Sequence, residues 1–329
     1  MDKLINDIFS CTPQTFDDVA LQVYRYQYEN VSVYRSFCEA MKRTPERVEK
    51  NEDIPFLPIE FFKSHKIIAD GKSTELLFES STTTGSIPSK HYVSDKTIYE
   101  TSFLKTFRQF YGEPEDYLIL ALLPSYLERG NSSLVYMTNE LIAQSKYSES
   151  SFFLHDTERL REVLRTALQN TSIKILLIGV TYALLDFAEQ FPMNLGNTIV
   201  METGGMKGRK AELTRTEVHQ FLQKQFSVPQ IHSEYGMTEL LSQAYTTRNG
   251  TFTCPPWMRV LARDPYEPTA ILAAGKTGAL NVIDLANVYS CSFIATSDAG
   301  TVLANGEFEV AGRMDAAETR GCNLMYTSM

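Results

Sequence analysis

Short apolar segments that alternate with amphipathic segments constrain the fold of this chain more than any other feature. Runs of strand length lie at 75–79, 117–123, 173–179 and 198–202. Apolar residues recur at helical spacing near 95–111, 131–143, 157–169, 181–190 and 214–225. Strands that alternate with helices predict an α/β layered fold around a largely parallel sheet. A capping box at Thr214 and Glu217 predicts the start of the last of these helices.

The sequence pattern divides the chain into four parts. Residues 1–52 have helical spacing, and 53–250 form the α/β core, which begins with an extended, proline-containing connector at 53–63. Residues 251–311 predict a small antiparallel β subdomain, and 312–329 remain as a tail. The β-like pieces of this subdomain lie at 258–262, 270–273, 279–284, 292–296 and 307–311.

Charge and cysteine content exclude several classes of function. The net charge is −9, and no block of five or six lysines and arginines occurs, which argues against nucleic-acid binding. The apolar runs are too short to span a bilayer, and the N-terminus lacks the apolar stretch of a signal peptide. Five cysteines without a CxxC pair indicate reduced thiols and no structural zinc. We therefore expect a cytoplasmic protein.

Two short motifs carry the chemistry. Residues 80–90 form a loop rich in hydroxyl groups, with one glycine and Lys90, whose donors suit phosphate oxygens. Residues 235–239, Tyr-Gly-Met-Thr-Glu, place an aromatic ring, a hydroxyl and a carboxylate together. Each has an ordinary alternative: a solvated Ser/Thr loop for the first, and a strand end followed by a helix start for the second.

Weaker motifs follow in sequence order. Residues 203–208 end a strand with two glycines, Gly204 and Gly205, which allow the backbone to approach a flat ligand closely. Residues 296–300 place Asp298 after a strand, where it could accept both ribose hydroxyls. Residues 312–315, Gly-Arg-Met-Asp, lie near the C-terminus. Plain turns and a surface ion pair are the alternatives.

In this order, the motifs resemble those of the adenylate-forming superfamily of acyl-CoA synthetases, luciferase and peptide-synthetase adenylation domains. The resemblance spans roughly residues 53–322. Its closest likeness is to the LuxE-type acyl-protein synthetases of bacterial bioluminescence operons. The segments Ile54–Lys63, Gly204–Gly208 and Arg320–Asn323 carry that closer likeness.

The resemblance implies a fold and a set of roles. It implies a large N-terminal domain with layers αβαβα and a small β subdomain, in which 53–250 bind nucleotide and acyl group. Lys90 would hold the β- and γ-phosphates and Tyr235 would lie against adenine, while Thr238 would contact the α-phosphate or the acyl carbonyl. Glu239 would ligate Mg²⁺. The other implied nucleotide contacts are Thr83, Thr84, Gly85, Gly204, Gly205, Asp298 and Arg313, with Asp315 at a hinge.

The sequence also departs from the family pattern. Thr82 and Ser297 stand where the family motifs usually have glycine. The chain ends at Met329, so we expect the mobile C-terminal domain with its adenylation lysine to be largely absent. Lys90, Lys207 or Arg313 are the residues that could compensate for that lysine.

The tail offers an acyl acceptor. The likeness to LuxE-type proteins implies a thioester near the C-terminus, and Cys322 lies there; an ordinary inert thiol is the alternative. His91 and His232 flank the two main motifs and could line the pocket. Without partners at metal-ligand spacing they predict structural histidines, and His232 is kept as the pocket candidate. Trp257 predicts a packing residue.

We therefore predict an ATP-dependent acid–thiol ligase. It would activate a carboxylic acid, by resemblance a fatty acid, as acyl-AMP and transfer the acyl group through Cys322, with Thr238 and Lys90 as the other catalytic residues. ATP and Mg²⁺ are the expected cofactors, and an acyl-accepting protein such as a reductase or carrier is the expected partner. The alternatives are a compact acyl- or aryl-CoA ligase similar to phenylacetate-CoA ligases, and a non-catalytic nucleotide-binding protein.

Overall fold

The computed structural model describes residues 1–81, 87–204, 213–246 and 250–314. The chain forms two compact units, each assembled from segments that are not contiguous in sequence. Unit 1 contains Met1–Ser102, Met237–Ser242 and the chain from Thr251 onward, and unit 2 contains Phe103–Gly236 and Gln243–Gly250. The predicted boundaries at 52, 250 and 311 rest on sequence pattern and stay predictions.

Unit 2 is built on a six-stranded sheet with the order β5-β4-β6-β7-β8-β9. All neighbours are parallel except β9, which is antiparallel to β8. Every residue of β4 is buried, which explains its unbroken apolar sequence, since parallel strands are covered on both faces. The strands are β4 (Tyr117–Leu122), β5 (Ser151–Phe152), β6 (Lys174–Gly179), β7 (Ile199–Glu202), β8 (His232–Tyr235) and β9 (Ala244–Thr246).

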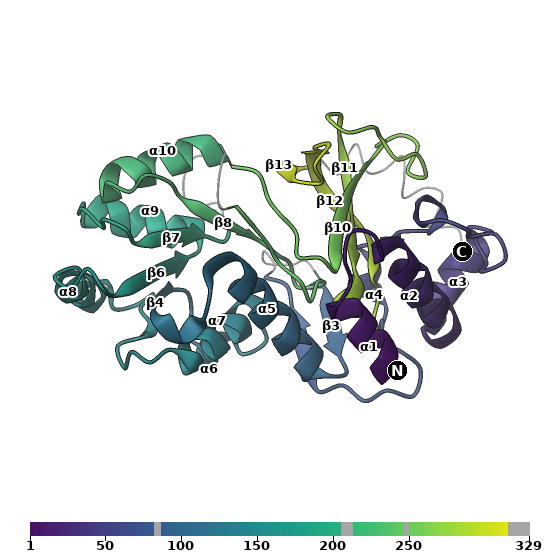
Figure 1. Ribbon diagram of the computed structural model, residues 1–329, viewed down its shortest axis with the longest axis horizontal. Coiled ribbons are helices and arrows are strands. Elements are labelled where there is room, and N and C mark those ends of the chain that lie inside the picture. The colour runs from purple at the N-terminus through teal and green to yellow at the C-terminus, as the bar shows by residue number, and fades with distance from the viewer. Residues whose placement is uncertain (82–86, 205–212, 247–249, 315–329) are drawn as a thin grey trace. The chain divides into compact units, whose positions relative to one another are not determined.

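Helices cover both faces of this sheet, with α9 and α10 on one side and α6 and α7 on the other (Figure 1). The predicted capping box starts α10: Thr214 Oγ1 accepts from Glu217 N, and the Glu217 carboxylate accepts from Thr214 N at 2.8 Å. The helices are α5 (Lys96–Tyr111, mostly in unit 2), α6 (Tyr126–Arg129), α7 (Ser133–Gln144), α8 (Thr157–Ala167), α9 (Thr181–Gln190), α10 (Arg215–Phe226) and the 3₁₀ turn η2 (Pro114–Asp116). The core consists of the apolar faces of β4, β6, α8, α9 and α10.

Unit 1 contains a five-stranded sheet, in which β1-β12-β11-β10 are neighbours and β13 also pairs with β12. Only β1 is parallel to its neighbour. The strands are β1 (Leu57–Pro58), β10 (Met258–Arg263), β11 (Thr277–Asp284), β12 (Phe293–Val302) and β13 (Phe308–Arg313), and a separate antiparallel pair is β2 (Leu76–Glu79) with β3 (Lys90–Val93). The helices are α1 (Asp2–Phe9), α2 (Phe16–Asn30), α3 (Ser32–Ala40), α4 (Phe61–Ser64), η1 (Asn51–Asp53) and η3 (Leu285–Asn287).

The N-terminal helices are part of the core of unit 1. The ring of Tyr34 stacks on Phe293 of β12 with centroids 6.1 Å apart, and its hydroxyl donates to Pro55 O at 2.7 Å. The buried amide of Gln27 donates to Asn287 O and accepts from Ser292 N, both at 3.0 Å. These contacts join α2 and α3 to the β subdomain, although more than 200 residues separate them in sequence.

The predicted α/β elements are confirmed, with three local differences. Residues 270–273 form no strand, and Ile271 makes only an isolated bridge to Arg263. The connector at 53–63 contains β1, which pairs with β12. Pro58 has no N–H to donate, and the next residue, Ile59, donates its N–H to Ala295 O. Asp298 lies inside β12 rather than after a strand, one residue before the register shift between Ala299 and Gly300. No helix in the described part of the chain is long and apolar enough to cross a bilayer.

Candidate functional site

The two main sequence motifs meet in unit 1. The ends of the 80–90 loop are joined, because Ser80 N donates to Ser89 O at 3.1 Å and Ser89 N donates to Ser80 Oγ at 2.9 Å. The Ser89 hydroxyl lies close enough to the carboxylate of Glu239 to lower the pKa of that carboxyl in part. The tertiary structure thus places the described end of the predicted phosphate loop against the predicted metal ligand, 150 residues further along the chain.

Glu239 is a buried residue, and only 5% of its surface is exposed. Burial raises the pKa of this carboxyl, and the Ser89 hydroxyl and the charges of Arg313 and Lys63 partly oppose that effect. A cation beside Glu239 would relieve the cost of burying its charge. Among the described residues no cluster of three or more His, Cys, Asp or Glu side chains could hold a metal. One carboxylate combined with phosphate oxygens is the ligand set that Mg²⁺ accepts, so Glu239 fits this ion.

A buried histidine fixes the main chain on both sides of this carboxylate. His91 of β3 has Nδ1 2.8 Å from Thr238 O and Nε2 2.9 Å from Asn287 Oδ1. Asn287 Nδ2 in turn donates to Glu239 O at 2.7 Å. Burial lowers the pKa of His91 to about 4, although its contacts with Thr238 and Asn287 oppose that effect. The hydrogen bonds of His91 confirm the structural role that we predicted for it, and the residues that it holds are Thr238 and Asn287.

Asp284 restrains the chain just after the 235–239 motif. Its buried carboxylate accepts from Leu241 N at 2.7 Å, Ser242 N at 3.0 Å and Ser242 Oγ at 2.5 Å. Burial raises the pKa of Asp284 to about 6, although these hydrogen bonds lower it in part. Residues 238–242 are therefore held by β3, η3 and β11 together.

The two predicted ribose ligands lie opposite each other on β12 and β13. Asp298 pairs in register with Arg313, and their side chains approach to 3.9 Å. The Arg313 side chain is 86% exposed and that of Asp298 is 16% exposed. Because the Arg313 end of the pair is open to solvent, the ion pair contributes little to stability, and Arg313 can turn toward a ligand at little energetic cost.

Two further predicted contacts lie in unit 2. Tyr235 is the last residue of β8, and Gly204 follows the end of the adjacent parallel strand β7. Gly204 has a φ of +74°, which a residue with a side chain rarely adopts. The chain passes from unit 2 to unit 1 between Gly236 and Met237, inside the motif. Gly204 and Tyr235 thus share one sheet edge, while Thr238, Glu239, Asp298 and Arg313 belong to unit 1.

Lys90 has a local partner. It lies on β3 opposite Glu79, and its Nζ is 3.6 Å from the Glu79 carboxylate, with 42% of the lysine side chain exposed. Its proposed contact with phosphate stays a prediction. The remaining predicted residues lie outside the described residues: Thr83, Thr84, Gly85, Gly205, Lys207, Asp315 and Cys322.

Sequence reasoning missed the residues that support the site. These residues show no recognisable spacing from Glu239 in the sequence: Ser89, Asp284 and Asn287. Asn287 and Asp284 are identified by hydrogen bonds to residues 239 and 241, more than 40 positions away, and Ser89 by its effect on the pKa of Glu239. His232 was predicted as structural, and it is buried with Nε2 2.9 Å from Gln230 Nε2 and Nδ1 3.2 Å from the Tyr111 hydroxyl. Trp257 is buried, and its Nε1 donates to Ser102 Oγ at 3.0 Å. Both therefore have packing roles.

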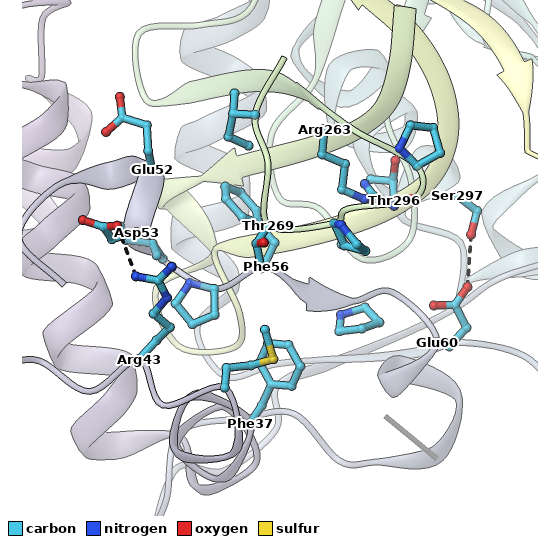
Figure 2. Close-up of a pocket in the computed structure, with 18 of the residues that line it drawn as sticks. Phe37, Arg43, Glu52, Asp53, Phe56, Glu60, Arg263, Thr269, Thr296 and Ser297 are labelled. Atoms are coloured by element: carbon cyan, nitrogen blue, oxygen red, sulfur yellow. Dashed lines mark hydrogen bonds and ion pairs between the residues drawn. The ribbon is translucent and has the colours of Figure 1, made fainter. Parts of the chain in front are cut away.

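Unit 1 also contains a pocket of about 70 Å³ beside the 296–298 motif. Figure 2 shows Phe37, Phe56 and Thr269 around this space, with the Arg43–Asp53 and Glu60–Ser297 pairs on opposite sides. Ser297 Oγ donates to Glu60 at 3.0 Å, and Arg43 Nη1 lies 3.2 Å from Asp53. The pocket is lined by the same proline-containing segment that carries the likeness to LuxE-type proteins.

Comparison with known proteins identifies the family. The model of the family described as "Acyl-protein synthetase, LuxE" matches residues 12–328, nearly the whole chain. The chain belongs to the LuxE acyl-protein synthetase family. A curated relative, the long-chain-fatty-acid–luciferin-component ligase of Vibrio harveyi, is 26% identical over 323 residues, covering 92% of this chain and 84% of that protein. The predicted family and its class, an acyl-protein synthetase-like ligase, are confirmed.

Solved structures share the fold of this family member. A 2-hydroxyisobutyryl-CoA ligase in complex with 2-HIB-AMP and CoA matches with a TM-score of 0.69 and 14% identity, over 94% of this chain and 71% of that one. ATP-bound MatB from Rhodopseudomonas palustris matches with a TM-score of 0.53 and 19% identity, over 72% of this chain. The match covers 47% of that MatB chain, so this chain spans about half its length. The fold of adenylate-forming ligases, predicted from the motifs, is confirmed.

Proposed function

We propose that this chain activates a fatty acid with ATP and passes the acyl group to a thiol, acting in the cytoplasm. The observation that carries the proposal is the 2.8 Å contact of His91 Nδ1 with Thr238 O, because it joins the strand that follows the phosphate-loop motif to the motif of the proposed metal ligand. Membership of the LuxE family supports the acid and the acyl transfer. The name of the Vibrio harveyi relative supports a long-chain fatty acid as the substrate.

The first step forms acyl-AMP. A carboxylate oxygen of the acid attacks the α-phosphorus of ATP, the new O–P bond forms, and pyrophosphate leaves with the electrons of the broken bond. Mg²⁺ held by Glu239 would neutralise charge on the phosphate oxygens. Thr238 and the 80–90 loop would orient these oxygens, and His91 keeps the main chain of Thr238 fixed. Positioning and charge stabilisation supply the catalysis.

The second step transfers the acyl group to sulfur. A thiolate attacks the acyl carbonyl, the C–S bond forms, and AMP leaves with the electrons of the C–O bond. The described part of the chain contains four free cysteines. Burial raises the pKa of Cys11 to about 11 and those of Cys38 and Cys254 to about 12, and it raises that of Cys291 further. Because the thiolate is the nucleophile, these four are poor acceptors. That supports Cys322 as the acceptor.

Incubation of the protein with labelled fatty acid, ATP and Mg²⁺ tests both steps. We expect acid-dependent exchange of pyrophosphate into ATP, and label on the protein that Cys322→Ser abolishes while exchange persists. Cys254→Ser is the matched control and retains the label. Label that persists in Cys322→Ser eliminates this cysteine as the acceptor. Acyl-CoA formed on addition of CoA, with no label on the protein, supports the CoA-ligase alternative instead.

A further inference from the structure

The carboxylate of Glu202, the last residue of β7, is a hub of hydrogen bonds in unit 2. Its Oε2 accepts from Gly204 N at 2.8 Å and from Thr181 Oγ1 at 3.0 Å. Its Oε1 accepts from Ser233 Oγ at 2.7 Å and lies 3.5 Å from His219 Nε2. Glu202 is 6% exposed. Four elements of the unit therefore meet at one buried carboxylate.

One side of this hub fixes the turn after β7. Besides the bond from Gly204 N to Glu202, Gly204 O accepts from Thr181 N at 3.1 Å. Thr203 N donates to Gly179 O, also at 3.1 Å. Both polar backbone groups of Gly204 are thus occupied, in a conformation with positive φ that glycine adopts without strain.

The other side of the hub fixes the strand that ends at Tyr235. Ser233 is the register partner of Glu202 in the parallel pair β7–β8. The Ser233 hydroxyl donates to Glu202, and the same Oγ lies 3.2 Å from His219 Nε2. Ser233 N donates to Thr246 Oγ1 at 2.7 Å. Tyr235 follows two residues later, at the same sheet edge as Gly204.

The hub remains ionised although it is buried. Burial pushes the pKa of Glu202 upward, but the hydrogen bonds from His219, Ser233 and Gly204 N outweigh it, and the net pKa is lowered. The pKa of the nearby acid Glu234 shifts in the opposite direction: burial and the charge of Glu202 raise it to about 8. A charged acceptor gives stronger hydrogen bonds than a neutral one, so Glu202 can hold both neighbours firmly.

We propose that Glu202 is a positioning residue that holds the Thr203–Gly204 turn in a fixed place relative to Tyr235 and thereby sets the affinity for the adenine nucleotide. The inference rests on the proposed function, because it takes Gly204 and Tyr235 as the nucleotide contacts of unit 2. Glu202 itself does not touch the reacting atoms. Its effect is on binding of ATP, not on the chemical step.

The test is a comparison of Glu202→Gln with the wild-type chain. The amide keeps the size of the side chain but replaces one acceptor oxygen with a donor, so bonds from Gly204 N or Ser233 are lost. We expect the Kd for ATP, measured by calorimetry, and the KM for ATP in pyrophosphate exchange to rise about tenfold or more. The kcat should stay within about threefold and the KM for the acid should not change.

Two further variants separate positioning from general stability. Glu128→Gln removes an exposed capping-box carboxylate of unit 2, and it should leave the Kd for ATP at the wild-type value. Ser233→Ala removes the hydroxyl that contacts Glu202 and His219 but leaves the carboxylate and its bond from Gly204 N, so we expect a smaller rise in Kd that adds little when combined with Glu202→Gln.

Each outcome has a distinct meaning. Wild-type protein that does not bind ATP refutes the proposed function itself. Wild-type protein that binds ATP, with the same Kd in Glu202→Gln, refutes the positioning role alone. A fall in kcat with unchanged KM for ATP also overturns it, because that pattern indicates loss of active protein. If Glu202→Gln does not fold, Ser233→Ala decides, and an unchanged Kd there rejects the inference.

Discussion

Protonation of His232 is expected to make unit 2 less stable in mild acid. Its Nε2 lies 2.9 Å from Gln230 Nε2, which can only donate, so Nδ1 carries the proton toward the Tyr111 hydroxyl. Burial lowers the pKa of His232 from 6.5 to about 4. Well above pH 6.5 the histidine is neutral in both the folded and the unfolded chain. As the pH falls toward 4, only the unfolded chain binds the proton, so the free energy of unfolding decreases.

The size of this effect follows from the shift. A pKa difference of about 2.5 between the two states corresponds to about 3.4 kcal/mol once the pH is below both values. Between about pH 7.5 and about pH 5.8, the same linkage gives a loss of about 1 kcal/mol from His232. This range stays above the isoelectric point near 5.2, where loss of net charge would promote precipitation. His91, whose pKa is also lowered by burial, contributes equally before and after substitution of His232 and cancels.

The assay is urea unfolding of the wild-type chain and of His232→Gln at the two pH values. The glutamine amide can accept from Gln230 but does not titrate, so the variant should lose about 1 kcal/mol less than wild type between the two pH values. Equal pH dependence in His232→Gln and wild type would refute the reasoning. That result would mean that the histidine is equally easy to protonate in the folded chain.

Two other substitutions test the site and its scaffold. In Glu239→Gln, loss of the carboxylate should reduce pyrophosphate exchange about 10²-fold or more, with an unchanged melting temperature; exchange within a few-fold of wild type would remove Glu239 from the metal site. In Gly300→Ala, the new Cβ would collide with Glu309 O and lie 3.0 Å from Leu280 Cδ1, so we expect a stability loss of about 1–3 kcal/mol. Thermal unfolding measures it, and a melting temperature equal to that of wild type would show that the bulge in β12 moves to make room.

Much of the fold was readable from local pattern. Strands such as β4 and β6 are continuous apolar runs because parallel strands are buried on both faces. The start of α10 was readable from its capping box. The strand predicted at 270–273 failed because short β-like pieces between turns carry little information on pairing. Strand β1 was missed because only its partner β12 makes it a strand.

The sequence by itself determined the family, the order of the motifs and the chemistry of their side chains, since these depend on residue identity and spacing along the chain. Only the tertiary structure decided which groups share a site. It joined Ser89 to Glu239, placed His91 between Thr238 and Asn287, and made Glu202 the link between Gly204 and the strand of Tyr235. The physical reason is burial. A carboxylate or imidazole that leaves water needs partners, and these come from strands whose neighbours are set by packing, not by sequence distance.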